Sequence, residues 1–382
     1  MIERTIVILI DALGFELCRA RGFAPAGLDR RARVRTVLGF SQAAIATILT
    51  GLSPAEHGLW MMYAFRPEGG PLRWLRLLPR SVSARRRWLR RLMEWNLRRV
   101  HGVRGYFSLY DVPREILPYL DLPARGDIFA PGGAAPAKTV LDELADAGTP
   151  ARVWDYRVDE ERSFDELETA VSGGCGRFFL LYAAGLDSDL HRYGTGDGRV
   201  ASRLERYGRR IERISDAARR SGGARIFVLG DHGMCDVRSR VDLMPGVGRL
   251  GLSIPGDYIP FYDSTMARFR VFSASARARL EELLAAAPGG RLLGEEEMRS
   301  LGAGGAGGRF GDLVYLADPG VVIAPSHMGA GAVAAMHGYH PDAEDMYSVM
   351  LSNAPLPGDE TALASVAGAI LPGFVPAGGV GP

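Results

Sequence analysis

The chain has little cysteine, almost no lysine and no long apolar run, and each shortage excludes a class of protein. Cys18, Cys175 and Cys235 are odd in number and widely spaced, so no disulfide framework is expected. No apolar run approaches the roughly 20 residues of a transmembrane helix. Charged Glu3 and Arg4 argue against a signal peptide. We therefore expect a cytoplasmic protein without a transmembrane segment.

The net charge is also small. The 46 basic residues, all Arg except Lys138, nearly balance 44 acidic ones and leave a net charge of +2. This balance argues against bulk nucleic-acid binding, so no nucleic-acid partner is expected. With 382 residues, of which 47% are apolar, the chain is long enough for one large core that carries insertions.

Strands and helices alternate along most of the chain. The apolar runs typical of buried strands are 5–10, 151–156, 178–183 and 225–229. The segments with helical spacing are 41–52, 137–147 and 204–220. This alternation predicts a single domain over 1–382, a doubly wound α/β sandwich with a mostly parallel central sheet. Ligand sites of such folds lie beyond the carboxyl ends of the strands.

Two stretches interrupt the alternation. Residues 60–125 contain a dense cluster of Arg and Trp between positions 73 and 99, and residues 236–320 are rich in Gly and Pro. We expect both to be insertions that form a cap over the site. The tail after Pro355 is rich in Gly, Ala and Pro, and we expect it to pack weakly.

The Arg/Trp cluster of residues 73–99 has two interpretations. The favoured one is an amphipathic helical hairpin with Arg outside and an apolar face packed on the core. That apolar face would consist of Trp74, Leu75, Leu78, Trp88, Leu92 and Trp95. Alternatively, the cluster makes peripheral contact with anionic lipid or holds a long anionic substrate, such as a lipid-linked phosphate.

Three side chains are candidates for one divalent cation. Asp187 and His191 are four residues apart, so one helical turn can present both, and His337 precedes Gly338, which permits a turn. Zn²⁺ readily takes imidazole nitrogen and carboxylate oxygen, although these ligand types also allow Mn²⁺. Asp189 is a less favoured alternative to Asp187.

A second set lies directly after two predicted strands. Asp11 follows the strand at 5–10, and Asp231 and His232 follow the strand at 225–229. Gly230 and Gly233 allow the chain to turn, so that neighbouring side chains converge. Each residue alone has an ordinary structural explanation, such as a turn or a helix cap. Their coincidence favours two metal ions roughly 4 Å apart, an arrangement suited to in-line phosphoryl displacement.

Ser41 lies at the predicted start of a helix. The ordinary interpretation is an N-cap. The functional interpretation is a nucleophile, because the free N–H groups and the dipole at a helix N-terminus bind phosphate oxygens and stabilise an alkoxide. Coordination of the Ser41 oxygen to a metal would lower the pKa of its hydroxyl further.

These segments resemble the alkaline phosphatase superfamily, most closely its type I phosphodiesterase and nucleotide pyrophosphatase branch. The stretch from Ser41 to Thr50-Gly51-Leu52-Ser53-Pro54-Ala55-Glu56-His57-Gly58 is similar to the nucleophile segment of that family. Its metal-binding segments are matched, in the same order, by Asp11, by Asp187 with His191, by Gly230-Asp231-His232-Gly233-Met234 and by Met336-His337-Gly338-Tyr339. The resemblance implies an alkaline-phosphatase-like fold, two Zn²⁺ ions and a phosphorylated Ser41 that water hydrolyses.

The chain departs from the family pattern beside the metal ligands. Gly185 and Leu190 stand where the E-P-D-x-x-G-H segment has Glu and Gly. Ala44 stands where the diesterase branch has an Asn that binds a phosphoryl oxygen. We expect the backbone N–H or the side chain of Gln42, or an Arg of the insertions, to replace that Asn. We expect a metal-dependent hydrolase of small-molecule or lipid-linked phosphate esters, with phosphodiesterase favoured over phosphomonoesterase. A phosphonate (C–P) hydrolase, a phosphomutase and a non-catalytic phosphate-binding protein remain alternatives. A sulfatase is disfavoured because the segment after Ser41 lacks the Arg of the sulfatase frame.

Overall fold

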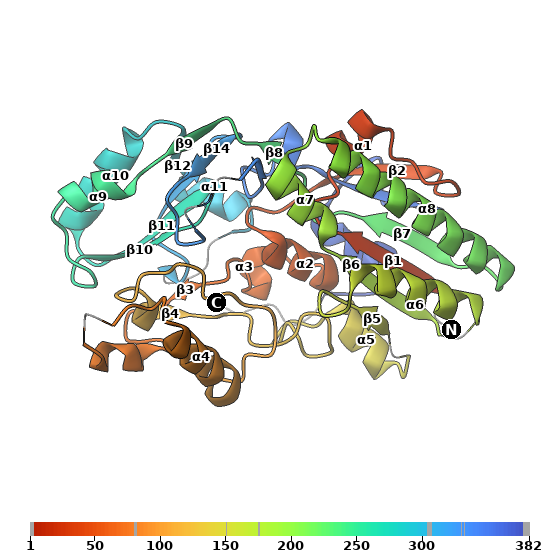
Figure 1. Cartoon of the computed structure of the whole chain (residues 1–382), viewed down its shortest axis with the longest axis horizontal. Coiled ribbons are helices and arrows are strands. Elements are labelled where there is room, and N and C mark those ends of the chain that lie inside the picture. Colours follow the sequence, from red (N-terminus) through yellow and green to blue (C-terminus); the bar gives the residue numbers. More distant parts are fainter. Residues whose placement is uncertain are drawn as a thin grey trace.

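A seven-stranded sheet forms the centre of the fold (Figure 1). The computed structural model describes residues 4–79, 82–149, 151–174, 176–303, 308–329, 331 and 333–376. In spatial order the strands are β17 (Glu360–Ala362), β2 (Arg30–Arg35), β16 (Ser348–Ser352), β7 (Arg225–Leu229), β1 (Thr5–Ile10), β6 (Phe178–Ala183) and β5 (Arg152–Trp154). Only β16 runs antiparallel to its neighbours, so the predicted mostly parallel sheet is confirmed.

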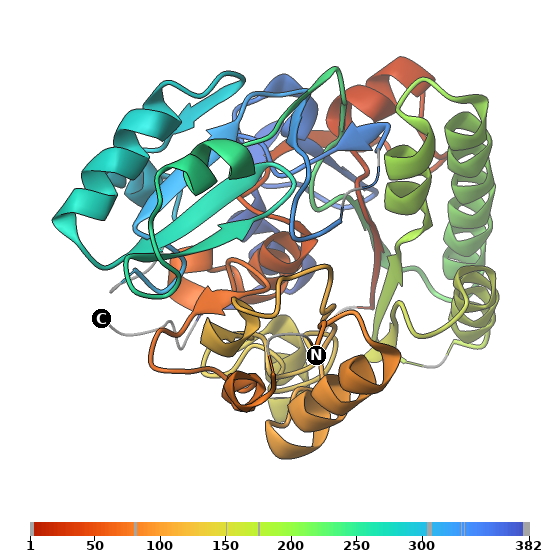
Figure 2. The ribbon, with the colours of Figure 1, turned by 60° about the vertical axis from the view of Figure 1, so that its left-hand side comes forward.

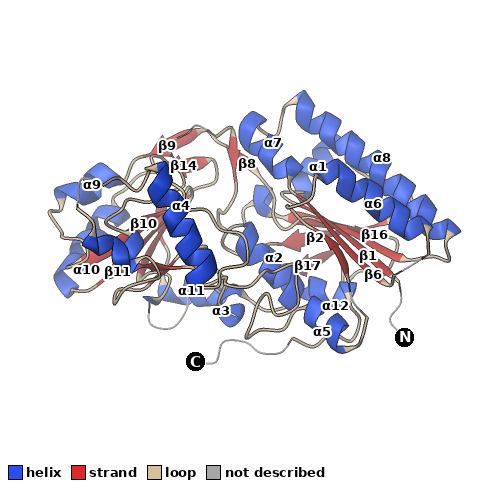
Figure 3. Cartoon of the chain, turned by 60° about the horizontal axis from the view of Figure 1, so that its bottom comes forward, coloured by secondary structure: helices blue, strands red, loops and turns tan. Residues whose placement is uncertain are grey.

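Helices cover both faces of this sheet, as Figure 3 shows. One face packs against α1 (Phe15–Arg21), α6 (Glu160–Ser172), α7 (Gly185–Tyr193) and α8 (Gly198–Arg220). The other packs against α2 (Ser41–Thr50), α5 (Val140–Asp146) and α12 (Val366–Ile370). Burial on both faces explains why β1 and β6 are continuous apolar runs without alternation. The doubly wound α/β sandwich is therefore confirmed.

A second lobe lies beside the carboxyl edge of the sheet (Figures 1 and 2). Its antiparallel sheet consists of β10 (Tyr258–Tyr262), β11 (Met266–Val271), β13 (Leu313–Ala317) and β12 (Gly290–Leu292). The helices of the same stretch are α9 (Met244–Arg249), α10 (Ala274–Ala285) and α11 (Glu295–Ser300). All of these elements fall within 236–320, one of the two segments that we expect to be insertions.

The segment 60–125 packs against this lobe. Its elements are β3 (Ala64–Phe65), η1 (Arg73–Leu77), α4 (Arg87–Trp95), η2 (Asn96–Val100), η3 (Leu117–Tyr119) and β4 (Leu120–Asp121). Tyr63 and Leu89 share a buried cluster with Ile259 and Phe261 of β10. The two segments therefore form one continuous wall, and their status as insertions on a family core stays a prediction.

Short elements complete the described chain. They are α3 (Pro54–His57), β8 (Cys235–Asp236), β9 (Ser239–Val241), β14 (Val321–Ile323), β15 (Ala335–Met336), η5 (Glu344–Met346) and η6 (Leu363–Ser365). Cys18 and Cys235 are free, and Cys175 lies outside the described residues. The helix predicted over 204–220 begins earlier, at Gly198, because the Asp197 side chain caps it.

The expectation of a weakly packed tail is wrong. Strand β17 pairs with β2 at the edge of the central sheet, and Leu363, Val366 and Ile370 are buried against the same core as α2. The Gly- and Ala-rich composition of the tail hid these few apolar residues, whose spacing gives α12 a buried face.

The predicted apolar face of the Arg/Trp cluster is also wrong in part. Leu75 is buried as expected, but the side chains buried from α4 and η2 are Leu89, Met93 and Leu97. Trp88 and Trp95 instead face solvent. The segment has two apolar stripes at helical spacing, and the aliphatic one packs on the fold.

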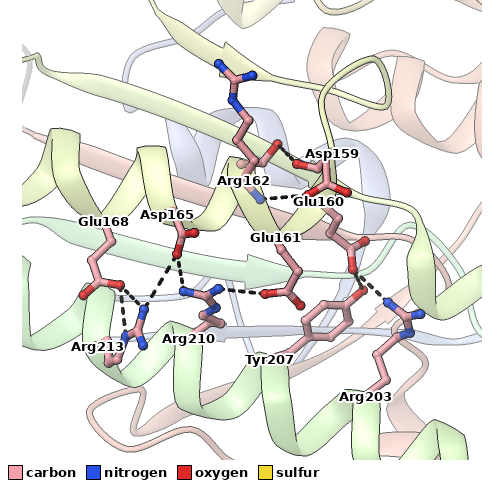
Figure 4. Close-up of polar contacts among 11 residues, drawn as sticks. Asp159, Glu160, Glu161, Arg162, Asp165, Glu168, Arg203, Tyr207, Arg210 and Arg213 are labelled. Carbon is pink, nitrogen blue, oxygen red and sulfur yellow. Dashed lines mark hydrogen bonds and ion pairs between the residues drawn. The ribbon is translucent and has the colours of Figure 1, made fainter.

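Ion pairs join α6 to α8 on the outside of the sandwich (Figure 4). Arg210 pairs with Glu161 and Asp165, and Arg213 pairs with Glu168. Exposed pairs of this kind contribute little singly. They show, however, that Arg210 and Arg213 of α8 have acidic partners on α6.

Candidate active site

The structure brings all six predicted metal ligands together at the carboxyl edge of the sheet. Asp11 follows β1, and Asp231 and His232 follow β7. Helix α7 begins directly after β6 and carries Asp187 and His191. His337 arrives from the loop after β15, and its ring stacks on that of His232 with centroids 3.8 Å apart.

The first predicted set forms a compact group. The ligand atoms of Asp187, His191 and His337 all lie within 4.8 Å of one another. His191 Nε2 is 3.3 Å from Asp187 Oδ1, and His337 Nε2 is 3.7 Å from it. His191 Nδ1 is 2.9 Å from the carbonyl oxygen of Ala335, which can only accept, so Nδ1 carries the proton. His191 Nε2 therefore presents a lone pair.

The second set is arranged in the same way. His232 Nδ1 lies 2.9 Å from the Gly233 carbonyl oxygen, so His232 Nε2 also presents a lone pair. This nitrogen is 3.4 Å from Asp11 Oδ1 and 3.3 Å from Asp231 Oδ2. Asp11, Asp187 and His232 also have ligand atoms within 4.8 Å of one another, so Asp187 lies between the two sets.

These contacts fit a metal centre. In two places an imidazole lone pair faces a carboxylate oxygen at 3.3 Å, and two acceptors repel unless a proton or a cation lies between them. Such a separation matches the roughly 3.3 Å between ligand atoms of a tetrahedral zinc with bonds near 2 Å. Asp187 Oδ1, Asp231 Oδ2 and His337 Nδ1 are buried and have no hydrogen-bond partner. A divalent cation would satisfy such groups.

Electrostatics support the same conclusion. Burial raises the pKa of Asp11 well above its usual value, and the charges of Asp231 and Asp187 raise it further. Burial also raises the pKa of Asp231. Burial lowers the pKa of His337, and the neighbouring His232 and His191 add to this shift. Without a cation, the site disfavours the ionised carboxylates that its ligand set requires.

Glycines and neighbouring hydroxyls hold the ligands in place. A Cβ on Gly230 would lie 2.2 Å from the carbonyl oxygen of Leu13, so these two segments approach too closely for a side chain. Gly338 has a φ of 85°, as the predicted turn requires. Thr265 donates to the Gly338 carbonyl at 2.9 Å, and Tyr182 donates to Asp11 Oδ2. No sequence motif had indicated Tyr182.

Ser41 is not a helix cap. The N-cap of α2 is Phe40, and Ser41 is the first residue inside the helix. The Ser41 hydroxyl lies 3.4 Å from Asp11 Oδ1 and 3.0 Å from His232 Nε2, so it belongs to the cluster. The two other hydroxyl side chains of α2, Thr47 and Thr50, are fully buried and do not reach the cavity wall.

Gln42 lies beside this hydroxyl on the cavity wall. Its side-chain Nε2 is buried and has no hydrogen-bond partner, although an amide N–H is a strong donor. The backbone N–H groups of Ser41 and Gln42, at the open end of α2, likewise have no acceptor among the described residues. Three N–H donors are therefore available at the start of α2: the Gln42 side-chain amide and the backbone N–H groups of Ser41 and Gln42.

Helix α7 is held by groups that the sequence pattern did not reveal. Glu160 of α6 accepts the backbone N–H of Gly185 at 2.8 Å, at the first turn of α7. Arg203 of α8 pairs with Glu160 at 2.9 Å and with Asp189 at 2.5 Å. Figure 4 shows Glu160 between Arg203 and Tyr207. A Cβ on Gly185 would lie 2.3 Å from an Arg203 guanidinium nitrogen, so Arg203 occupies the space beside Gly185, where the family pattern has a Glu.

A cavity of about 380 Å³ opens over Ser41. Segment 60–125 contributes Tyr63, Tyr106 and Tyr110 to its wall, and segment 236–320 contributes Phe261 and Asp263. None of the described residues that line the cavity is Lys or Arg. Aromatic side chains therefore make up a large part of the wall, and Ser41, Gln42 and the metal-ligand cluster contribute polar groups to it.

A family model of type I phosphodiesterases / nucleotide pyrophosphatases matches residues 5–340. The chain belongs to this family. The predicted membership is confirmed, and with it the prediction of a metal-dependent phosphoric ester hydrolase. A search of curated proteins gives no match.

Solved structures agree in fold. Murine ectonucleotide pyrophosphatase / phosphodiesterase 5, in an inactive form in complex with AMP, is 14% identical, with a TM-score of 0.64 over 96% of this chain and 94% of its own. The human protein of the same name is 13% identical, with a TM-score of 0.65 over 96% and 93%. Among the residues described for this chain, no helix has the length and apolarity to span a bilayer. The cytoplasmic location stays a prediction.

The site makes a prediction about which aspartate of α7 binds metal. Asp187→Asn should bind less metal than the unaltered protein, because the Asp187 oxygen lies between the imidazoles. Asp189→Asn, the matched control, should bind as much metal as the unaltered protein, because Asp189 is paired with Arg203. Metal content after dialysis, measured by mass spectrometry of the elements, checks this. Equal losses in both variants would contradict the assignment.

Proposed function

We propose that this enzyme hydrolyses phosphodiesters by attack of Ser41 on phosphorus. The observation that carries the proposal is the position of the Ser41 hydroxyl, which lies 3.0 Å from His232 Nε2 and opens onto the cavity. Asp11 and the end of α2 hold this oxygen in place, so it is oriented before substrate arrives.

Two sets of residues would hold the metal ions. Asp187, His191 and His337 form one set, and Asp11, Asp231, His232 and Ser41 form the other. Bound divalent cations, Zn²⁺ or Mn²⁺, would neutralise the carboxylates and stabilise charge that develops on phosphoryl oxygens. The identity and number of the ions belong to this proposal, which rests on the facing acceptor atoms described above.

In the proposed reaction, Ser41 attacks phosphorus, and Gln42 and the start of α2 bind a phosphoryl oxygen. The bond from Ser41 Oγ to phosphorus forms while the bond from phosphorus to the leaving alcohol breaks, and the serine proton ends on the departing oxygen. The unpartnered Gln42 amide and the free N–H groups of α2 donate to a phosphoryl oxygen. Water then attacks the phosphorylated Ser41, which restores the hydroxyl and releases a phosphomonoester.

The cavity favours a diester over a monoester. A diester carries one negative charge, and its second ester group can occupy the aromatic wall. A monoester carries up to two charges on phosphate at neutral pH, and no Lys or Arg among the described lining residues is present to balance the second. The charge of the cavity therefore supports the phosphodiesterase alternative.

The first test compares bis-p-nitrophenyl phosphate with p-nitrophenyl phosphate as substrates of the metal-loaded enzyme. We expect faster turnover of the diester, and a loss of at least about 10³-fold in kcat for Ser41→Ala, because the nucleophile is removed. Ser202→Ala, the same change on the exposed face of α8, is the control. Undiminished turnover by Ser41→Ala would contradict the proposed mechanism. Faster monoester turnover would indicate a phosphatase, and turnover of neither ester a C–P hydrolase.

A second test addresses Gln42. Replacement by Leu keeps the size of the side chain but removes its donor, so kcat/KM for the diester should fall roughly 10- to 100-fold, the range for a hydrogen bond to a charged group. Metal content should not change, because Gln42 is not a proposed ligand. Steady-state kinetics beside metal analysis check both points, and an unchanged kcat/KM would remove Gln42 from the site.

A further inference from the structure

The outer surface of α4 and η2 carries exposed apolar side chains that neither the core nor the cavity uses. Trp88, Leu92 and Trp95 are 52%, 41% and 56% exposed. Nine large apolar side chains are exposed among the described residues, and five of these nine lie between positions 77 and 100. Such clustering differs from the scattered exposed apolar residues of an ordinary surface.

Helical geometry separates this surface from the buried side of α4. Leu89, Met93 and Leu97 recur every four residues and pack into the cluster that includes Tyr63. Trp88, Leu92 and Trp95 follow the spacing of a second stripe, about a quarter to a third of a turn away. The buried stripe already anchors the helix, so stability of the fold does not account for two exposed tryptophans.

The charge of this surface is strongly positive. Residues 73–99 contain ten Arg and one acidic residue, Glu94. Arg91 and Arg99 are exposed on the same side as the tryptophans, and neither forms an ion pair with an acidic residue of the described chain. Helix α8 is also rich in Arg, but three of its arginines, Arg203, Arg210 and Arg213, pair with acids of α6 (Figure 4). We call Trp88, Arg91, Leu92, Trp95 and Arg99 the α4 patch.

We propose that the α4 patch docks the enzyme on the surface of an anionic lipid bilayer. Tryptophan prefers the boundary between headgroups and acyl chains, and arginine binds anionic headgroups. A helix with apolar and basic residues on one exposed face lies in the plane of such a surface. Helix α4 lies on the outside of the molecule in Figures 1 and 3, and an exposed helix surface suits a flat partner better than a peptide that needs a groove.

Helix α4 and η2, which carry the α4 patch, also contact the segment that forms the rim of the cavity. Arg90 of α4 donates to the Tyr110 carbonyl oxygen at 2.8 Å, and the Arg98 guanidinium lies 4.8 Å from the Phe107 ring centroid. Tyr106 and Tyr110, from the same short segment, line the cavity. Docking through α4 would therefore bring the rim of the cavity close to the lipid headgroups. The binding itself does not depend on the proposed chemistry.

The test is sedimentation with vesicles of phosphatidylcholine alone or with about one-third phosphatidylserine, at low and high salt. We expect the full-length protein to sediment with the anionic vesicles only, and less at high salt. Trp88→Ala/Trp95→Ala and Arg91→Glu/Arg99→Glu should each weaken binding at least about tenfold, because each removes one of the two attractions. Ser41→Ala should bind like the unaltered protein, which separates docking from catalysis.

A matched control makes the same change of charge elsewhere. Arg206→Glu/Arg209→Glu lies on the exposed face of α8, on another side of the molecule (Figure 1), and should leave vesicle binding within about twofold. Equal losses in the α8 and α4 variants would mean that only net charge acts, and would overturn the proposal. Absence of vesicle binding would overturn it as well. So would lipid-free dimerisation that the Trp88→Ala/Trp95→Ala change abolishes, because a second copy would then cover the patch.

Discussion

Mutual repulsion among carboxylates and imidazole lone pairs is the constraint around which this protein is built. Asp11 and Asp231 are buried, Asp187 lies between them, and His191 and His232 turn unprotonated nitrogens toward these oxygens. The described cavity wall contains no Lys or Arg to balance this charge. A bound cation relieves the repulsion, so folding of the site and binding of metal are coupled.

The architecture makes this costly arrangement possible. Parallel strands deliver Asp11, Asp231 and the start of α7 to one edge, which antiparallel neighbours could not do together. Helix α7 is then held from outside by Glu160 and Arg203, two residues that belong to neighbouring helices. They occupy the space beside Gly185, where the family pattern has a glutamate.

The features predicted correctly are those that depend on residues close together in the sequence. Apolar runs marked β1, β6 and β7, because strands buried on both faces contain little else, and ligand residues at their ends marked the site. The remaining parts depend on contacts between distant segments. Glu160 lies 25 residues before Gly185, and nothing in its own segment distinguishes it from a solvated helix acid.

The two wrong predictions have the same origin. In the tail after Pro355, the few apolar residues of α12 pack against residues of α2. These residues are distant in the sequence and come together only in the folded chain. In α4, two stripes of apolar residues have helical spacing, so spacing alone does not show which one is buried. The aliphatic stripe, rather than the one with the tryptophans, packs closely in the core. The spacing alone placed Trp88, Leu92 and Trp95 on the core side, and the structure shows that they face solvent.

The central claim is that the clustered acceptors form a two-metal centre around Ser41. The most direct test is diffraction from crystals of the zinc-loaded protein, recorded at the zinc absorption edge. The account predicts two anomalous peaks, one touching Asp187, His191 and His337 and the other touching Asp11, Asp231, His232 and the Ser41 oxygen. Peaks only at the protein surface, or none in a protein that still turns over a diester, would contradict it.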